Sequence, residues 1–496
     1  MIGGPPFRPG EEEFGRLRQG GNLIPVCREI AADLLTPVSA SMRLAVGARQ
    51  HFLLESVEGG ESLARYSFLG RDPFCVLKGW GRRSVLEEGG RSRSLAEDPL
   101  EALRMLSRRY RPVPIPDLPR FAGGGVGYIS YDLARLRERI PFTVVDDLQV
   151  PDLVFGFYDL LLAFDHPRQR IQIISLVRTE DGKGSWKARY REACRRILAI
   201  ERRLAEAPPR HRLSRPRVAP RLRPTRPDRE FLHAVEQARR AIRAGEIFQV
   251  VLSRRFEHPA PASPFSVYRT LRRLNPSPYL FYLAFPEVTL AGASPEMLVR
   301  VEGSRIQTRP IAGTRPRGSG EEEDRILEAS LRADAKERSE HLMLVDLGRN
   351  DLGRVCRFGS VTVKQFMEVE RYSHVMHLVS SLEGALRPGV HPAEALMACF
   401  PAGTVTGAPK LRAMEIIDRL EGLKRGPYAG VVGYVDFSGN LDTCITLRTA
   451  VMKGRTAYLQ AGAGIVADST PARENRECLS KAQVLFTAVR EAGRMV

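Results

Sequence analysis

Two pairs of acidic residues in the second half of the chain have a spacing that suits metal binding. Glu337 and Glu340 are three residues apart, and Glu474 and Glu477 repeat that spacing. Residues at positions i and i+3 share one face of a helix, so each pair would present two carboxylates in the same direction. Carboxylate oxygens are ligands that Mg²⁺ prefers. Spacing alone also allows an ordinary solvated helix face with a Glu477–Lys481 ion pair.

Other patterns limit the chemistry. Residues 310–314 have the pattern of a strand ending in a glycine turn, and Ala312 within them has no nucleophilic atom. His377 stands in an apolar run with a helix-like pattern, where a histidine is more often structural than catalytic. The glycines of residues 403–407 lack the spacing of a phosphate loop, so ATP binding is not predicted.

Composition indicates a globular protein that functions in the cytoplasm. The chain has 496 residues, of which 43% are hydrophobic and 27% charged, enough for a sizeable core. No apolar stretch approaches membrane-spanning length, and the N-terminus lacks the features of a signal peptide. The 7 cysteines are scattered without a CxxC pair, which favours reduced thiols over disulfides or zinc.

A Pro/Arg-rich linker at residues 202–229 is predicted to separate an N-terminal region, 1–201, from a catalytic region, 230–496. It also concentrates part of the net charge of +18. A basic chain raises the possibility of nucleic-acid binding. However, no aromatic residue interleaves with the arginines of the linker, and its prolines prevent a regular helix. The sequence therefore does not favour a nucleic-acid partner.

The elements around these residues favour an α+β fold. In the N-terminal region short β-type runs are predicted at 52–56, 66–70, 126–131, 153–164 and 171–176, followed by a helix after residue 187. In the catalytic region strands are predicted at 249–256, 279–285, 289–293, 297–302, 430–435, 444–451 and 457–461. Helices are predicted there at 228–244, 264–274, from 322 toward 346, and at 471–491. Neighbouring strands mixed with grouped helices favour large antiparallel sheets over a βαβ repeat.

Several longer motifs resemble the chorismate-utilising enzymes and follow the order of that family. They are residues 309–314, 336–347, 349–355, 373–378, 403–410, 445–448, 461–466 and 471–482. The resemblance covers residues 230–490. It implies the fold of that family, in which large antiparallel sheets form a sandwich-like composite with helices packed outside.

The resemblance implies a role for each matching residue. Glu340 and Glu477 match Mg²⁺ ligands, with Glu337 and Glu474 beside them. Glu296 matches the general acid that protonates the departing hydroxyl of chorismate, and His377 matches the histidine linked to loss of pyruvate. Further contacts to chorismate are implied for Ala312, Gly313, Thr314, Thr404, Tyr428, Arg448, Gly462, Gly464 and Lys481.

Two positions favour addition of ammonia to chorismate. Members that make aminodeoxychorismate usually have a lysine nucleophile where this chain has Ala312. Isochorismate and salicylate synthases have a lysine base where this chain has Gln249, and an amide cannot act as that base near neutral pH. The resemblance therefore implies anthranilate synthesis. The alternatives within the family are synthesis of 2-amino-2-deoxyisochorismate or of isochorismate.

The resemblance also implies a tryptophan effector site. Residues 53–56, 65–68 and 275–281 resemble the feedback site of anthranilate synthase large subunits. The residues that match this site are Leu54, Glu55, Ser56, Asn275, Pro276, Ser277, Pro278, Tyr279, Leu280, Val432, Tyr434 and Cys444. No glutaminase region follows the last motif, so we expect ammonia to come from a separate glutamine amidotransferase subunit or from solution.

Overall fold

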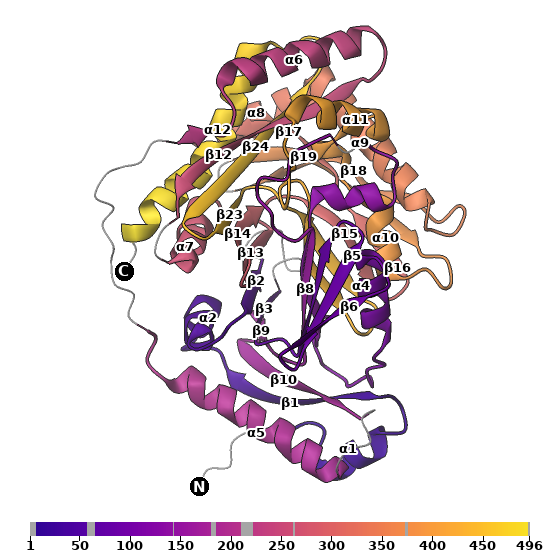
Figure 1. Cartoon of the computed structure of the whole chain (residues 1–496), viewed down its shortest axis with the longest axis vertical. Helices are drawn as coiled ribbons and strands as arrows, with labels where there is room; N and C mark the ends of the chain where they lie inside the picture. The colour runs from indigo at the N-terminus through magenta and orange to yellow at the C-terminus, as the bar shows by residue number, and fades with distance from the viewer. Residues whose placement is uncertain are drawn as a thin grey trace.

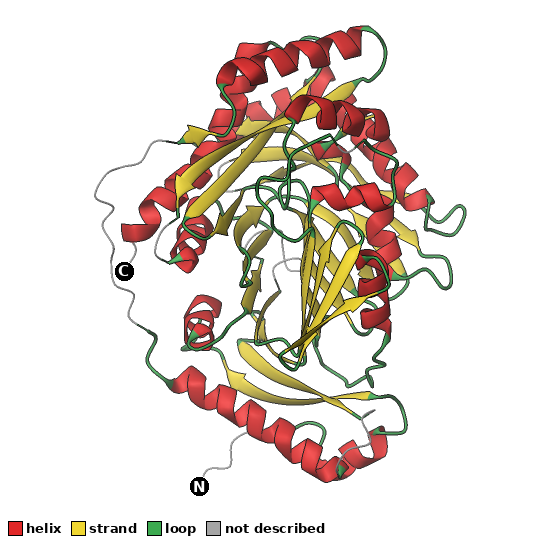
Figure 2. Ribbon diagram, viewed as in Figure 1, coloured by secondary structure: helices red, strands yellow, loops and turns green. Residues whose placement is uncertain are grey.

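The computed structural model describes residues 6–56, 65–141, 143–179, 185–209, 222–260, 263–372 and 375–494. Within these residues the chain forms two antiparallel sheets of twelve strands each. The strands occupy the centre of the molecule and the helices lie around them (Figures 1 and 2). The predicted α+β fold with large antiparallel sheets is confirmed.

The first sheet combines strands from both halves of the chain. The strand order begins with β1 (Leu23–Ala31), β10 (Arg170–Arg178), β9 (Leu160–Asp165), β3 (Tyr66–Arg71) and β2 (His51–Glu55). It continues with β13 (Tyr279–Ala284), β14 (Thr289–Ser294), β23 (Thr449–Lys453), β24 (Thr456–Ile465), β12 (Gln249–Pro259) and β11 (Arg223–Pro224), and β20 (Gly407–Ala408) also pairs with β12.

The second sheet is likewise shared between the two halves. Its order begins with β17 (Ile311–Pro316), β19 (Val375–Ala385), β16 (Arg305–Thr308), β15 (Met297–Glu302), β22 (Leu441–Ile445) and β21 (Val431–Asp436). It continues with β7 (Gly124–Ile129), β8 (Leu153–Tyr158), β4 (Cys75–Trp80), β5 (Arg83–Glu88) and β6 (Arg91–Leu95), and β18 (Thr362–Arg371) also pairs with β19.

Alternating side chains build the core on both faces of the first sheet. Phe52 and Phe68 belong to a core cluster that also includes residues of the second sheet, and the Phe68 ring lies 6.0 Å from the Tyr434 ring. The next residues along the chain, Leu53 and Leu69, belong to a second cluster together with the helices on the opposite face. Strand side chains point alternately to the two faces, so consecutive apolar residues bury both.

The helices pack against these sheets. Those against the outer face of the first sheet are α2 (Pro37–Ala45), α5 (Trp186–Ala205), α7 (Pro264–Leu274) and α12 (Pro471–Glu491). Those against the second sheet are α4 (Pro99–Arg108), α8 (Glu321–Ala333), α9 (Ala335–Gly353) and α10 (Pro392–Cys399). The others are α1 (Glu11–Leu17), α6 (Asp228–Arg243), α11 (Lys410–Glu421) and the short helices η1 (Tyr131–Leu136), η2 (Gly403–Val405) and η3 (Ala492–Arg494).

Three predicted elements are wrong because the chain changes direction inside each of them. Residues 153–164 form β8 and β9, which belong to different sheets and are separated by Asp159, an ion-pair partner of Arg196. Residues 444–451 contain the end of β22 and the start of β23, again in different sheets. The predicted helix from residue 322 is two helices, since Asp334 is extended and its side chain caps α9.

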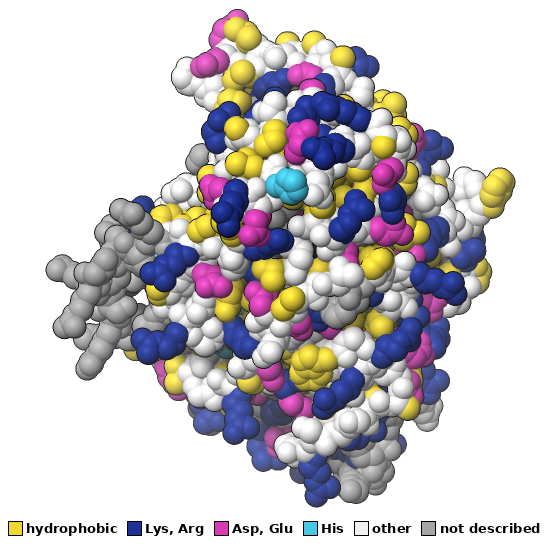
Figure 3. Space-filling model, turned by 45° about the horizontal axis from the view of Figure 1, so that its top comes forward, with side chains coloured by type: hydrophobic (Ala, Val, Ile, Leu, Met, Phe, Trp, Pro, Cys, Tyr) yellow, Lys and Arg dark blue, Asp and Glu magenta, His cyan; other side chains and the backbone are white. Residues whose placement is uncertain are grey.

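The surface is consistent with a basic composition spread over the molecule. On the face shown in Figure 3, Lys and Arg side chains lie among Asp and Glu side chains. No helix in the described part of the chain is long and apolar enough to cross a membrane. Residues 210–221 of the predicted linker, and Ser373 and His374 of one motif, lie outside the described residues.

Candidate active site

A cavity of about 840 Å³ lies where the two sheets meet helices α9 and α12. Residues from β12, β24, β17, β19 and η2 complete its wall. The structure brings together in this cavity all the residues predicted for catalysis, substrate and metal: Gln249, Glu296, Ala312, Gly313, Thr314, Glu337, Glu340, His377, Thr404, Tyr428, Arg448, Gly462, Gly464, Glu474, Glu477 and Lys481.

Glu296 is a buried carboxyl in the wall of this cavity. It directly precedes β15, and its backbone carbonyl accepts a hydrogen bond from Ile445 N at 3.0 Å. Burial raises the pKa of Glu296 from its ordinary value to about 8, and the Thr404 hydroxyl has a smaller opposing effect. The carboxyl therefore holds its proton near neutral pH, which is the state that a general acid needs.

His377 lies on β19 rather than on a helix, which corrects the predicted pattern of this run. Its neighbour in the pairing is Thr314 of β17, where the register shifts at Gly313. Gly313 has a φ of 62°, a conformation that favours glycine, and its carbonyl lies 2.9 Å from His377 Nδ1. Because a carbonyl only accepts, Nδ1 carries the proton and Nε2 holds the lone pair. Burial lowers the pKa of His377, so the ring is neutral.

The four glutamates of the predicted metal site face one another across the cavity from two helices. Glu337 and Glu340 lie on α9, and Glu474 and Glu477 lie on α12. Burial and the nearby charge of Glu337 raise the pKa of Glu340. Burial raises the pKa of Glu474, with a smaller contribution from Glu477. Such mutual repulsion between carboxylates is relieved when a cation binds.

The donor set fits a hard divalent cation that retains open positions. Within the described residues no three acidic, histidine or cysteine side chains form a complete ligand cluster. Mg²⁺ is usually bound through one or two carboxylates together with water and substrate oxygens, so such a cluster is not needed. The sequence did not predict Lys336 or Asp468, which form an ion pair of 3.2 Å beside the glutamates. Lys336 is the first residue of the motif at 336–347, and Asp468 lies between the motifs at 461–466 and 471–482.

Two cationic side chains could hold a carboxylate in the cavity. Arg448 lies between β22 and β23 and has a φ of 45°. Among the residues that the structure describes, no carboxylate acts on its pKa. Burial lowers its pKa. Lys481 Nζ contacts Glu477 Oε1 at 2.7 Å and Gly462 O at 3.1 Å. A buried guanidinium without a counter-charge favours an anionic ligand.

Two glycines of β24 leave room for neighbouring side chains. A Cβ at Gly464 would lie 2.8 Å from Gln249 Nε2, and one at Gly462 would lie 2.7 Å from the Tyr428 hydroxyl oxygen. Real Cβ atoms do not approach other atoms so closely. Glycine at both positions therefore lets the Gln249 amide and the Tyr428 phenol line the cavity.

A separate pocket of about 50 Å³ contains most of the predicted effector residues. The predicted residues that line it are Leu54, Glu55, Ser56, Pro278, Tyr279, Leu280, Val432, Tyr434 and Cys444. Asn275, Pro276 and Ser277 do not line it. Instead, Asn275 Oδ1 accepts a hydrogen bond of 3.2 Å from Arg448 Nη1 in the larger cavity, and Asn275 Nδ2 donates to Ser277 Oγ at 3.0 Å.

The pocket with the predicted effector residues also contains polar residues that were not predicted from the sequence. Arg300 of β15 and Asp442 of β22 are cross-strand partners with an ion pair of 2.9 Å. Arg120 lies 3.3 Å from the same carboxylate, and the Tyr279 hydroxyl donates to Asp442 at 2.9 Å. The sequence did contain one signal for this pocket, because Arg300 is a charged residue between apolar residues of a strand.

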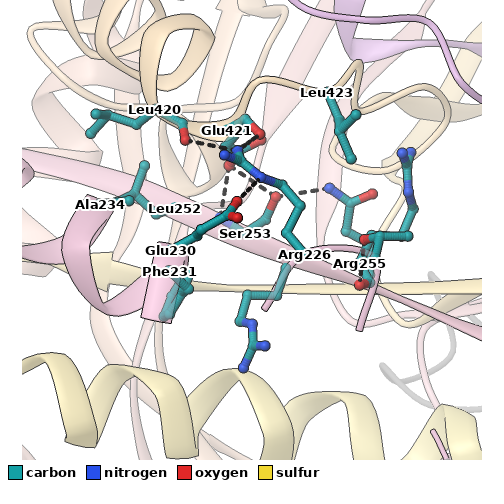
Figure 4. A pocket seen from close by; sticks show the side chains of 13 residues that line it. Arg226, Glu230, Phe231, Ala234, Leu252, Ser253, Arg255, Leu420, Glu421 and Leu423 are labelled. Carbon is teal, nitrogen blue, oxygen red and sulfur yellow. Dashed lines mark hydrogen bonds and ion pairs between the residues drawn. The ribbon is translucent and has the colours of Figure 1, made fainter. Parts of the chain in front are cut away.

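A third pocket, also of about 50 Å³, lies between β12, α6 and α11 (Figure 4). Its central carboxylate is Glu421, which accepts hydrogen bonds from Ser253 N and Oγ. Arg425 adds an ion pair of 2.7 Å to Glu421. Because its charged groups are paired inside the protein, this pocket holds β12, α6 and α11 together. The cavity of about 840 Å³ is therefore the candidate active site.

The comparisons with known proteins define the class. The family model for chorismate binding enzymes matches residues 50–487. The chain belongs to the chorismate binding enzyme family, and the predicted family is confirmed. It is 46% identical to anthranilate synthase component 1 of Acetivibrio thermocellus, covering 99% of this chain and 100% of that protein. It is 47% identical to anthranilate synthase component 1 of Thermus thermophilus, covering 94% of this chain and 98% of that protein.

Solved structures agree with this assignment. The crystal structure of anthranilate synthase component I from Streptococcus pneumoniae matches with a TM-score of 0.76 and 37% identity, covering 92% of this chain and 99% of that one. The menaquinone-specific isochorismate synthase of Escherichia coli matches with a TM-score of 0.70 at 21% identity, covering 97% and 98%. The latter similarity shows a shared fold.

Proposed function

We propose that this chain is the large subunit of an anthranilate synthase, which converts chorismate and ammonia to anthranilate, pyruvate and water. The observation that carries the proposal is its similarity to anthranilate synthase component 1 over nearly its whole length. Gln249 and Ala312 in the cavity wall support ammonia addition, because neither side chain can act as a base or a covalent nucleophile.

In the first step, chorismate loses its 4-hydroxyl group as ammonia attacks C2. Glu296, protonated near neutral pH, gives its proton to the hydroxyl, which leaves as water. Ammonia forms the new C2–N bond and then releases one proton. Arg448 and Lys481 would hold the substrate carboxylates, and the planar guanidinium of Arg448 suits a bidentate contact.

We also propose that the reaction requires Mg²⁺. Glu340 and Glu477 would hold the ion, with Glu337 and Glu474 beside them. When bound, Mg²⁺ would bind the ring carboxylate and withdraw charge from the ring. The raised pKa of Glu340 beside other carboxylates supports a cation at this position.

His377 is proposed to act in the second step, when the amino intermediate loses pyruvate and becomes aromatic. The ring proton at C2 must leave, and the neutral imidazole with its Nε2 lone pair is a suitable acceptor. His377→Gln is expected to lower anthranilate formation at least about a hundredfold while chorismate is still consumed. Mass spectrometry should then detect the amino intermediate. Anthranilate at the wild-type rate would contradict this role.

The alternatives within the family make different products from the same substrate. An isochorismate synthase would consume chorismate without ammonia, and a 2-amino-2-deoxyisochorismate synthase would stop before pyruvate loss. The test is to incubate the protein with chorismate and Mg²⁺, with and without ammonium salt, and to identify the product by mass. Ammonia-dependent release of both anthranilate and pyruvate supports the proposal, and either alternative product overturns it.

Ammonia is proposed to come from a separate glutamine amidotransferase subunit. The relatives are named component 1, which implies a second component. We further propose that the complex works in the cytoplasm, where the seven free cysteines of the chain would stay reduced.

Tryptophan is proposed to bind the effector pocket and inhibit the reaction. Leu54, Leu280 and Val432 supply apolar walls for an indole ring, and Glu55 and Arg300 supply charges for the amino and carboxylate groups. The Asn275–Arg448 hydrogen bond connects the neighbouring loop to the active site, which supports coupling between the sites.

Ser56→Ala and Pro278→Ala test this pocket. Each variant is expected to raise the tryptophan concentration that halves the activity by about tenfold, because contacts to the effector are lost. Turnover without tryptophan should stay close to wild type. Titrating tryptophan into the assay checks this expectation, and unchanged inhibition in both variants would contradict the site.

A further inference from the structure

A smaller cavity lies directly behind Glu296. It has a volume of about 40 Å³ and is enclosed by α9, the start of β15 and the turn at η2. Glu296 and Thr404 line this inner cavity and also line the active-site cavity. These two residues therefore form a wall with one face toward the substrate and the other toward the inner cavity.

Two residues that have no role in the proposed mechanism, Asp351 and Lys410, meet beside the inner cavity. Asp351, from residues 349–355, lines it, and Lys410, from residues 403–410, forms an ion pair with Asp351 at 2.8 Å between Nζ and Oδ2. The two side chains are 10% and 13% exposed, so the pair stands between the inner cavity and solvent.

The groups around Asp351 favour proton exchange. Burial raises its pKa, and Lys410 and Arg354 act in the opposite direction. Glu138, which lies 3.7 Å from Arg354, raises the pKa again. A carboxyl with a raised pKa takes up and releases a proton closer to neutral pH than an exposed aspartate does.

The inner cavity is large enough and polar enough for water. A site needs roughly 10–15 Å³ of such volume to hold one water molecule, together with polar neighbours. Glu296, Thr308, Thr404 and Asp351 supply carboxyl and hydroxyl groups along its wall. Water here could hydrogen-bond toward Glu296 on one side and Asp351 on the other.

We propose that water in the inner cavity carries a proton from the Asp351–Lys410 pair to Glu296 after each turnover. The inference rests on the proposed function, in which Glu296 gives its proton to the departing hydroxyl. The resulting carboxylate takes a proton from a cavity water, and that water takes one from Asp351. Asp351 is resupplied by the Lys410 ammonium that is hydrogen-bonded to it, and Lys410 regains a proton from solvent. The path reloads the acid while substrate or product fills the other side.

The test compares the first turnover with later ones. The first turnover uses the proton that Glu296 already holds, whereas each later turnover needs the path. For Asp351→Asn we expect a single-turnover rate within about twofold of wild type and a steady-state rate about tenfold lower. Asp351→Glu, which restores a carboxyl, should recover most of the steady-state rate. A merely structural role would lower both rates together.

Gly348→Ala gives a second test that leaves every titratable group in place. Gly348 lines the inner cavity, and a Cβ there would lie 3.5 Å from Leu382 and 3.6 Å from Thr308, ordinary contact distances. The methyl group should displace water and lower the steady-state rate alone. If Asp351→Asn does not fold, Gly348→Ala still tests the proton path.

Equal effects on both rates, or no effect on either, in the folded variants would overturn the proton path. Wild-type protein is measured in parallel with chorismate, Mg²⁺ and ammonium salt. If it forms no anthranilate, the proposed function itself fails, and the path fails with it. The two failures are therefore distinguishable.

Discussion

Glu296→Gln is expected to lower the rate of anthranilate formation about a thousandfold, within the range for loss of a general acid. Glutamine has nearly the same size and keeps polar atoms in place, but it cannot give a proton to the departing hydroxyl. Steady-state kinetics with chorismate, Mg²⁺ and ammonium salt measure this effect. Activity within tenfold of wild type would contradict the assignment of Glu296 as the acid.

The pH dependence of protein stability provides a control for Glu296→Gln, because it tests whether Glu296 is protonated in the folded protein. The pKa of Glu296 is about 8 in the folded protein and near 4.5 for an ordinary glutamate. Between these values the folded protein holds a proton that the unfolded chain releases, so the Glu296 contribution lowers stability as pH rises through this window. Glu296→Gln should therefore be at least as stable as wild type at pH 8, as thermal unfolding would show. Wild-type turnover should also fall above about pH 8 as the acid ionises.

Glu340→Gln is expected to lower turnover at least about a hundredfold at ordinary Mg²⁺ concentrations, because it removes one of two proposed ligands. Raising the Mg²⁺ concentration should restore part of the activity. Mn²⁺ binding, followed by its paramagnetic signal, provides a readout that does not depend on turnover, and it should weaken in the variant.

Asp346→Asn is the matched control on the same helix. Asp346 is 63% exposed and pairs with Arg349 at 3.3 Å, so its loss should leave both metal binding and turnover near wild type. Stability should not fall in Glu340→Gln. Burial and then repulsion from Glu337 raise the pKa of Glu340, and the amide removes the charge that both disfavour. Full activity in Glu340→Gln would remove the residue from the metal site.

Much of the fold could be predicted because local patterns agree with it. Helix α7 begins at a proline and ends before Asn275, and α12 carries Glu474 and Glu477 on the face that meets the cavity, as their spacing predicted. The gathering of residues as distant as Gln249 and Lys481 could be predicted only from resemblance. Nothing in local spacing shows that β12 pairs with β24 beside α12.

The missed features depend on contacts between distant segments. The chain crosses between sheets at Asp159 and near Arg448, where a single charged residue interrupts a largely apolar run, so each crossing looked like one strand. The Arg300–Asp442 pair depends on the register of β15 with β22, which local sequence does not specify. The run around His377 resembled a helix because a short apolar run around one polar residue fits both the helical period and the strand period.

The most direct measurement is anthranilate fluorescence from the purified protein incubated with chorismate, Mg²⁺ and ammonium salt at mildly alkaline pH, with and without tryptophan. The proposed function predicts that fluorescence rises only when ammonium is present and that tryptophan suppresses the rise. Chorismate consumption without anthranilate would contradict the central claim and assign the chain to another reaction of its family.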